Sequence, residues 1–256
     1  MKQHKKYFFF DIDGTLTFDR GRQTAPHTLE CLRRLKENGH KVFIASGRLQ
    51  ADTAEMAARF GIDSFVSDGG NSITVENRIL SMKPLPRETC IRFLEQLERD
   101  DVPWGVIIEN KKERWVRDKR VTQYTSGSFL KNIIDPSFDY HTAPQFFKIF
   151  VGCTPEEQPR IDFGSLPVVR FNPQCVYVEP DDKSVGIRAM MQHLNAPLKD
   201  VVVFGDGSND LKMFCPEWFS IAMGNAKDTL KAKADYITAD CEADGIYEAC
   251  RHFGWI

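Results

Sequence analysis

Several features that mark common protein classes are missing from this sequence of 256 residues. No apolar run approaches the roughly 20 residues that a membrane-spanning helix needs, so we expect no membrane partner. The formal net charge is only −2, which gives nucleic acid no basic surface to bind. There is no internal repeat and no low-complexity segment. With 42% hydrophobic and 27% charged residues, the composition is that of a globular protein.

The cysteines form no recognisable pattern. Seven are present, an odd number, and no two stand in C-x-x-C spacing. This argues against a disulfide framework and against a zinc site, and it fits a reducing cytoplasm. The basic start at Lys2, Lys5 and Lys6 runs directly into an apolar strand. We therefore expect no cleavable signal peptide and a cytoplasmic location.

What the sequence does contain is an alternation of apolar strands and amphipathic helices. Strands are expected at residues 7–10, 41–45, 64–67, 201–204, 219–222 and 236–237, with a hairpin over 72–80. Helices are expected over residues 24–38 and 51–60, and from residues 183, 226 and 243. This order predicts an α/β fold, a doubly wound parallel sheet.

The middle of the chain has a different order of predicted helices and strands. After two prolines, a helix is expected over residues 87–99 and a weaker one over 121–134. Short strands are expected at residues 106–108, 114–116, 147–151, 168–171 and 175–179. We therefore predict an inserted α+β domain over residues 82–181 with a largely antiparallel sheet, and a core formed by residues 1–81 and 182–256.

Three apolar strands end in polar loops that contain glycine. Asp11 and Asp13 follow the first strand, and Ser46 follows the second. Asp206 and Asp210 follow the strand over residues 201–204. Because the carboxyl ends of parallel strands lie on one edge of a sheet, these side chains are expected to converge. Four carboxylates cannot all be ionised there without a cation, and oxygen ligands suit Mg²⁺.

Two further groups would complete a site for a phosphate. Ser46 and the amides of Gly47 and Arg48 are expected to open a helix, which is a ready anion site. Lys183 begins a later helix and offers positive charge. The structural alternatives remain open: strand-ending turns for the first acids, helix caps for Ser46 and the later acids, and a surface position for Lys183.

These segments resemble the four motifs of the haloacid dehalogenase-like phosphatases. The matching stretches are Asp11-Ile12-Asp13-Gly14-Thr15, Ser46-Gly47-Arg48, Lys183, and Gly205-Asp206-Gly207-Ser208-Asn209-Asp210. The insert between the second and third motifs is similar to the class IIB cap of the Cof-type branch, which includes bacterial hexose-phosphate phosphatases. The resemblance covers essentially the whole chain, and its motifs are specific in combination although each is common alone.

The resemblance implies a role for each matching residue. Asp11 is the expected nucleophile, and Asp13 is the expected general acid and base. A Mg²⁺ site is implied at the Asp11 carboxylate, the Asp13 backbone carbonyl and Asp206, with Asp210 holding a ligand water. The phosphate-binding residues that the resemblance implies are Ser46, Gly47, Lys183 and Asn209.

Substrate choice is where the sequence is least informative. Family members commonly have Asn-Gly-Ala where this chain has Asp68-Gly69-Gly70, a loop expected on the substrate side. Lys183 follows Asp181-Asp182 instead of a glycine-containing turn, although Gly186 stands at the usual offset. The candidates for contact with the leaving group are Gly69, Arg170 and Asn172.

The sequence therefore predicts a Mg²⁺-dependent phosphatase of small phosphorylated metabolites, with sugar phosphates as the expected substrates and an aspartyl phosphate as intermediate. One alternative is a phosphomutase that uses the same intermediate. Another is a non-catalytic sugar-phosphate-binding regulator, against which the intact Asp11 and Asp13 pair argues. The expected partner is a small phosphate monoester, and the expected state is a monomer or a weak homo-oligomer.

Overall fold

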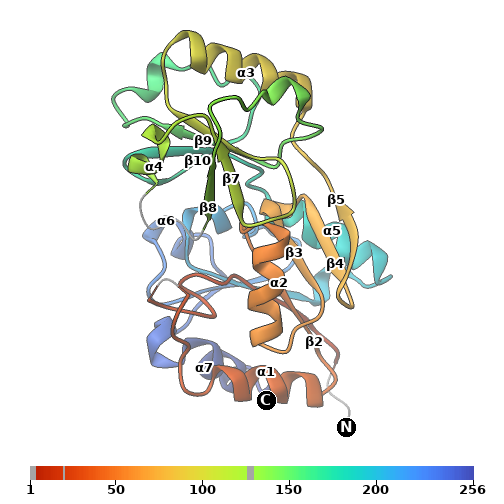
Figure 1. Cartoon of the computed structure of the whole chain (residues 1–256). Helices are drawn as coiled ribbons and strands as arrows, with labels where there is room; N and C mark the ends of the chain where they lie inside the picture. The colour runs from red at the N-terminus through yellow and green to blue at the C-terminus, as the bar shows by residue number, and fades with distance from the viewer. Residues whose placement is uncertain (1–3, 20, 126–129) are drawn as a thin grey trace. The chain divides into compact units, whose positions relative to one another are not determined.

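The computed structural model describes residues 4–19, 21–125 and 130–256, the side chain of Phe171 excepted. The chain divides into two compact units, each with its own sheet (Figure 1). The first unit comprises Met1–Arg48, Thr53–Ser81 and Asp182–Ile256, and the second comprises Leu49–Asp52 and Met82–Asp181. Within the described ranges, no helix is both long and apolar enough to cross a membrane.

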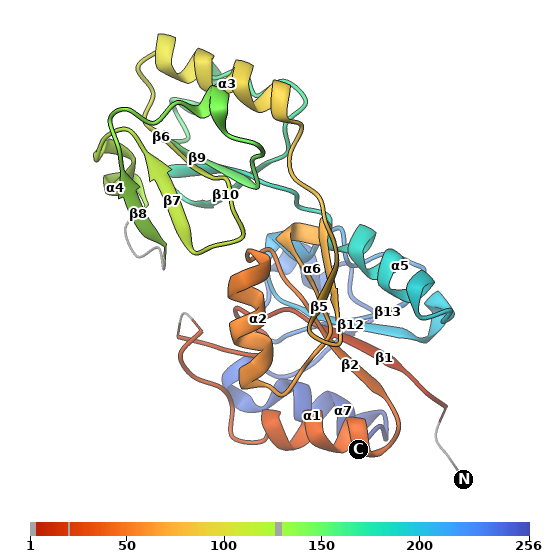
Figure 2. The same ribbon diagram turned by 45° about the vertical axis from the view of Figure 1, so that its right-hand side comes forward.

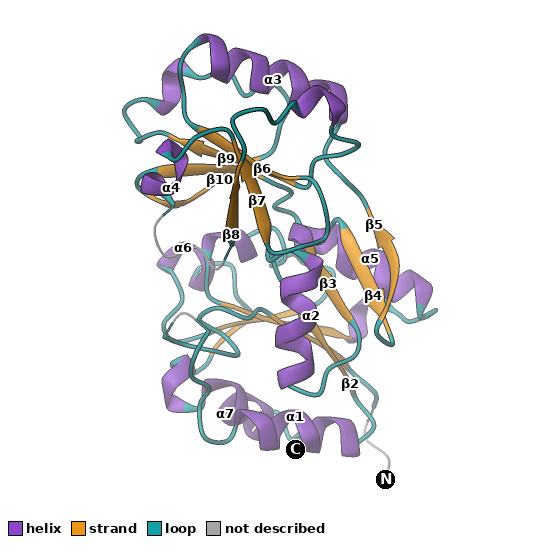
Figure 3. Ribbon diagram, viewed as in Figure 1, coloured by secondary structure: helices purple, strands orange, loops and turns teal. Residues whose placement is uncertain are grey.

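The first unit contains an eight-stranded sheet in the order β14-β13-β12-β1-β2-β3-β4-β5. Figure 3 draws strands in orange and labels β2 to β5 of this sheet. Its strands are β1 (Tyr7–Phe10), β2 (Lys41–Ala45), β3 (Phe65–Ser67), β4 (Ser72–Val75), β5 (Arg78–Met82), β12 (Val201–Gly205), β13 (Phe219–Ala222) and β14 (Tyr236–Ile237). The strands from β14 to β3 are parallel, and β4 is antiparallel to β3. Phe10 pairs with both Ile44 and Phe204, so the carboxyl ends of β2, β1 and β12 lie side by side.

Helices cover both faces of this sheet. Packed on one face are α1 (Thr28–Glu37), α2 (Gln50–Arg59) and α7 (Gly245–His252), and packed on the other are α5 (Lys183–His193) and α6 (Asp228–Lys231). Helices α1 and α7 lie next to each other in both ribbon views (Figure 1, Figure 2). The predicted doubly wound α/β fold is confirmed.

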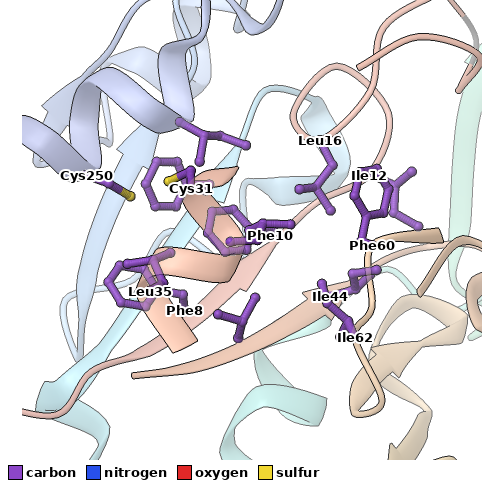
Figure 4. Packing of buried hydrophobic residues seen from close by; sticks show 14 of the residues in the cluster. Phe8, Phe10, Ile12, Leu16, Cys31, Leu35, Ile44, Phe60, Ile62 and Cys250 are labelled. Atoms are coloured by element: carbon purple, nitrogen blue, oxygen red, sulfur yellow. The ribbon is translucent and has the colours of Figure 1, made fainter. Parts of the chain in front are cut away.

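Strand β1 shows why four consecutive aromatic residues suit this position. Phe8 and Phe10 belong to the core under α1 and α7, which Figure 4 shows from close by. Tyr7 and Phe9 belong to the core under α5. Because successive side chains of a strand point to opposite faces, a strand covered on both faces needs apolar residues at every position.

The second unit contains a six-stranded sheet in the order β10-β11-β9-β6-β7-β8. Its strands are β6 (Trp104–Ile107), β7 (Glu113–Val116), β8 (Lys131–Ile134), β9 (Lys148–Gly152), β10 (Val168–Asn172) and β11 (Cys175–Val178). Neighbours are antiparallel except β7 and β8, which are parallel. Helix α3 (Arg87–Arg99) packs its apolar side on one face, and α4 (Arg120–Tyr124) contributes to a smaller cluster on the other.

Several of the predicted helices need correction. The helix expected over residues 121–134 is wrong: α4 ends at Tyr124, and Lys131–Ile134 pairs with β7 as strand β8. The β-branched Ile133 and Ile134 favour that strand, and residues 126–129 of the expected helix lie outside the described ranges. Helix α1 begins at Thr28 and not at residue 24, because Pro26 disfavours a helical conformation at the residue before it.

Short 3₁₀ turns complete the chain. Two of them lie in loops that carry predicted site residues, namely η1 (Asp68–Gly70) and η5 (Ser208–Asp210). The others are η2 (Tyr140–Thr142), η3 (Gln158–Arg160), η4 (Leu198–Asp200) and η6 (Cys241–Ala243). Helix α6 begins at Asp228 and α7 at Gly245, each two residues later than the sequence predicts.

Candidate active site

The carboxyl ends of β1 and β12 hold a buried cluster of charges. Carboxylate oxygens of Asp11, Asp206 and Asp210 lie within 4.8 Å of one another. The Lys183 ammonium donates to Oδ1 of Asp11 at 2.5 Å and to Oδ1 of Asp210 at 2.6 Å. Lys183 and Asp11 are 172 positions apart in the chain. The fold thus brings together four of the residues that the sequence selected.

Asp206 approaches the first loop closely because Gly14 has no side chain. A Cβ atom at Gly14, where φ is +90°, would lie 2.1 Å from Oδ2 of Asp206. The Thr15 hydroxyl donates to Oδ1 of Asp206 at 3.0 Å. Thr15 belongs to the first motif, yet the sequence alone gave it no role. Gly14 and Thr15 therefore fix the place of Asp206 beside Asp11.

Asp210 organises its own loop. Its Oδ2 accepts from the backbone N–H groups of Asp206 at 3.0 Å and Gly207 at 2.9 Å, while Oδ1 accepts from Lys183. The side chain is fully buried. A Cβ atom at Gly205 would lie 2.7 Å from Cγ of Asp210, so the strand needs glycine at its last position. Asp210 thus links the loop after β12 to the ammonium of Lys183.

The electrostatics of the cluster are unbalanced. Burial raises the pKa of Asp11 well above its ordinary value, and the neighbouring carboxylates add to this against the opposing effect of Lys183. Burial and then Asp210 raise the pKa of Asp206 to about 7. Burial acts to lower the pKa of Lys183, but Asp11 and Asp210 outweigh it and raise that pKa. When every group is ionised, three carboxylates face one ammonium, an excess of negative charge that a divalent cation would offset.

The raised pKa of Asp206 predicts how stability depends on pH and Mg²⁺. The pKa of the Asp206 carboxyl is 3.8 in the unfolded chain and about 7 in the folded one, so between these pH values the folded state binds one more proton than the unfolded state. Binding of this proton stabilises the folded state. The stabilisation is complete below pH 3.8 and is lost as pH rises through about 7. Mg²⁺ at about 100 times its Kd should raise Tm by roughly 5–10 °C at about pH 8. The same concentration of Mg²⁺ should raise Tm much less at about pH 5.5, because protons compete with the cation for the carboxylates.

Thermal unfolding at both pH values, with and without Mg²⁺, measures this dependence. Asp206→Asn is the matched control, since its neutral amide should abolish the Mg²⁺-induced rise in Tm at either pH. Equal rises at both pH values in the wild-type protein would contradict the expectation.

Asp13 is not part of the buried cluster. Its side chain is 50% exposed and accepts two hydrogen bonds from Arg48, from Nε at 2.8 Å and from Nη2 at 2.7 Å. Gly21, where φ is +82°, lies against this pair, because a Cβ atom there would be 2.9 Å from Nη2 of Arg48. The sequence assigned a role only to the backbone amide of Arg48. No spacing in the sequence links its side chain to Asp13, so this contact comes from the structure alone.

Ser46 lies in a turn after β2. It is buried, and its hydroxyl accepts from the amide of Arg48 at 3.1 Å. Helix α2 begins only at Gln50, so the expectation that Ser46 opens a helix is wrong. The hydroxyl instead closes a local turn, a conformation that serine favours. Because β2 pairs with β1, the turn that contains Ser46 and Gly47 follows directly beside Asp11.

The remaining predicted residues of the first unit lie in two loops. Gly69 is buried in η1 with φ at +58°, and its amide donates to the Ser46 carbonyl at 3.2 Å. Asn209 lies in η5 and is partly buried. A Cβ atom at Gly70 would lie 2.1 Å from the carbonyl oxygen of Asp182, so the loop after β3 packs tightly against the start of α5. The loop after β3 therefore contacts Asp182, the residue before Lys183, and the loop after β12 contains Asp210 next to Asn209. Both loops thus border the cluster of Asp11 and Lys183.

Arg170 and Asn172 lie in the second unit and have extensive partners there. The Arg170 guanidinium donates to the side chain of Gln158 and to the backbone carbonyls of Cys153, Thr154, Asn172 and Pro173. Asn172 accepts from the amide of Gln174 at 2.8 Å and donates to the hydroxyl of Tyr177 at 3.4 Å. These bonds hold the ends of β10 and β11, and contact with a substrate stays a prediction for both residues.

Comparisons with known proteins extend over both units. A family model described as haloacid dehalogenase-like hydrolase matches residues 8–250. A Bacillus subtilis protein named "Putative phosphatase YkrA" is 31% identical over 252 residues, which are 97% of this chain and 98% of that protein. A phosphoglycolate phosphatase of Nitrosopumilus maritimus is 28% identical over 251 residues, 96% of this chain and 94% of that one. The solved structure of the HAD subclass IIB sugar phosphatase BT4131 is 29% identical with a TM-score of 0.81, covering 98% of this chain and 100% of that one.

Proposed function

Because this chain belongs to the haloacid dehalogenase-like hydrolase family, we propose that it is a Mg²⁺-dependent phosphatase of small phosphate monoesters that acts through an aspartyl phosphate on Asp11. The observation that carries the proposal is the Lys183 ammonium between Asp11 and Asp210, with Asp206 beside them. The phosphatase names of the relatives support the reaction, and the sugar phosphatase among the similar structures makes sugar phosphates the first candidates. We propose that the second unit is a cap that contributes to substrate choice.

In the first half-reaction an oxygen of the Asp11 carboxylate attacks the phosphorus, and the bond from phosphorus to the leaving oxygen breaks. Asp13, protonated and no longer held by Arg48 at both oxygens, gives its proton to that oxygen, so the product leaves as a neutral alcohol. Lys183 offsets the negative charge shared by Asp11 and the phosphoryl group, which is the main catalytic need in phosphoryl transfer. Ser46 and the Gly47 amide are proposed to hold the phosphoryl oxygens.

In the second half-reaction water attacks the phosphorus of the aspartyl phosphate. Asp13, now ionised, takes a proton from this water, and the bond from phosphorus to Asp11 breaks. Inorganic phosphate leaves, and both carboxyl groups return to their starting states. One residue thus serves as acid in the first half-reaction and as base in the second.

The residues present fit a divalent cation. The three carboxylates exceed the charge of Lys183, and their oxygens lie close enough to share an ion. Asp11, Asp206 and the Asp13 carbonyl would hold it, with Asp210 beside them. When bound, Mg²⁺ supplies positive charge that lets an anionic nucleophile approach an anionic phosphate.

Phosphate release from a panel of phosphorylated metabolites, with and without Mg²⁺, tests the proposal. Mg²⁺-dependent release from at least one monoester is the expected result. A phosphomutase would convert sugar phosphates while releasing little phosphate, and a binding regulator would release none. Either of these outcomes would overturn the proposal.

Asp13→Asn should lower turnover by about 10²–10⁴-fold, because the amide can neither give nor take the required proton. Substrate affinity should change only a few-fold, since the side chain is exposed and lies outside the buried cluster. Steady-state rates and equilibrium binding of the substrate measure the two effects separately. Asp19→Asn, the same chemical change in the following loop, is the control and should keep turnover. Unaltered turnover in Asp13→Asn would refute its role.

A further inference from the structure

The segment between β13 and α6 bonds to both loops that are proposed to hold the cation. The amide of Lys227 donates to the backbone carbonyl of Asp206 at 3.0 Å, in the loop after β12. Two residues earlier, the Asn225 side chain donates from Nδ2 to the carbonyl of Gly14 at 2.9 Å, in the loop after β1. Asn225 and Gly14 are 211 positions apart in the chain. This one short segment therefore connects the two loops.

Asn225 is itself held from its other side. Its Oδ1 accepts from the amide of Cys241, the first residue of η6, at 2.7 Å. Because one partner is a carbonyl and the other an N–H group, only one orientation of the side-chain amide satisfies both. The amide of Gly224 donates to the carbonyl of Ala239 at 2.9 Å, and a Cβ atom at Gly224 would lie 2.3 Å from Oδ1 of Asp240. Asn225 is thus fixed between the loop after β1 and the chain that leads into α7.

The bond from Asn225 restrains the peptide that carries the Asp13 carbonyl. The amide of Gly14 donates to the carbonyl of Thr17 at 2.7 Å, and the carbonyl of Gly14 accepts from Asn225. The peptide between Asp13 and Gly14 is trans and planar, so a fixed Gly14 N–H also fixes the direction of the Asp13 carbonyl. Glycine is the most flexible residue, and bonds on both of its sides are what holds it in one conformation.

We propose that Asn225 is a positioning residue that sets the spacing between the Asp13 carbonyl and Asp206, and that it thereby supports binding of the cation. Its two hydrogen bonds go to backbone atoms, so it acts on the expected ligands through the loops that carry them. Groups that orient metal ligands in this way typically change metal affinity by about 10–100-fold when they are lost. The inference rests on the proposed function, because the cation belongs to the same site.

Asn225→Ala tests the role without any substrate. The rise in Tm over a series of Mg²⁺ concentrations at about pH 8 gives the Kd of the ion. We expect this Kd to rise by about 10-fold or more in the variant. Ca²⁺ accepts longer and less regular ligand distances, so its Kd, measured in the same way, should change by no more than about threefold. A general loss of stability would lower Tm without the ion and leave the ratio of the two Kd values unchanged.

Asn38→Ala is the matched control. The Asn38 side chain is also exposed and also donates to a distant backbone carbonyl, that of Trp255 at 2.8 Å. Its loss should leave the Kd values of Mg²⁺ and Ca²⁺ unchanged. Equal Mg²⁺ affinity in Asn225→Ala and the wild-type protein would overturn the inference. So would an equal fold-increase in Kd for both ions.

Hydrogen exchange in the wild-type protein decides the matter even if Asn225→Ala does not fold. Because coupling between two sites is reciprocal, saturating Mg²⁺ should slow exchange at the amides of Lys227 and Cys241 by up to about 10-fold. Unchanged exchange at both amides, in protein whose Tm rises with Mg²⁺, would overturn the positioning role and leave the proposed function intact. If Mg²⁺ neither raises Tm nor supports phosphate release, the proposed function itself fails. The two failures are therefore distinguishable.

Discussion

Asp11→Asn is expected to lower turnover by about 10⁵-fold while substrate binding remains measurable. The asparagine oxygen still accepts a hydrogen bond from Lys183, so the packing of the cluster is kept, but an amide is too weak a nucleophile to form an acyl phosphate. The variant should also be at least as stable as the wild-type protein at about pH 8. It removes one buried negative charge from a cluster in which three carboxylates face a single ammonium. Initial rates, substrate affinity and urea unfolding measure the three effects.

A second buried carboxylate provides the control. Asp200 lies in the same unit and pairs with Lys6 and His4. Asp200→Asn should keep turnover within about threefold, although it removes a buried charge as well. Full turnover in Asp11→Asn would show that another group attacks the phosphorus.

Lys183→Met is expected to lower the free energy of unfolding by about 3–5 kcal/mol and turnover by about 10²–10³-fold. The substitution removes the only ammonium in contact with Asp11 and Asp210 among the described ion pairs. It leaves these two buried carboxylates and the partly buried Asp206 to repel one another. Saturating Mg²⁺ or a pH of about 5.5 should restore part of the stability, because each lowers the unbalanced charge. Urea unfolding under the three conditions measures this.

A double-mutant cycle separates this charge effect from a loss of packing. Asp210→Asn removes one of the two carboxylates that Lys183 contacts. In the double variant, the loss of stability should be smaller than the sum of the two single losses by about 1–3 kcal/mol. If the two losses of stability are simply additive, Lys183 and Asp210 have no favourable interaction energy.

The part of the fold that could be predicted depends on local pattern. Residues 7–10 are apolar at every position, which already indicates a strand covered on both sides, and the structure packs Phe8 and Phe9 into opposite cores. The convergence of Asp11 with Asp206 followed from one rule, that parallel strands end on the same edge of a sheet. Glycine and acid residues at those ends were visible in the sequence.

What could not be predicted depends on contacts between distant segments. The Arg48 side chain reaches Asp13 through the geometry of a loop, and the sequence contains nothing that pairs them. Glu113–Val116 consists of two polar residues followed by two apolar ones, so the sequence does not show which face is covered. Arg114 therefore looks like a surface residue, although it is 1% exposed. Residues 131–134 form a strand because they pair with β7, and this pairing between separate segments is not visible in the sequence around them.

The most direct test of the account is to trap the covalent intermediate. Asp13→Asn is mixed with substrate and Mg²⁺, quenched in acid, and reduced with borohydride, which converts an aspartyl phosphate to homoserine. We expect homoserine at position 11 in the peptide that runs from residue 7 to residue 20, and none in a variant that also carries Asp11→Asn. A phosphoryl group on any other residue, or homoserine absent while substrate is being hydrolysed, would contradict the assignment of Asp11 as the nucleophile.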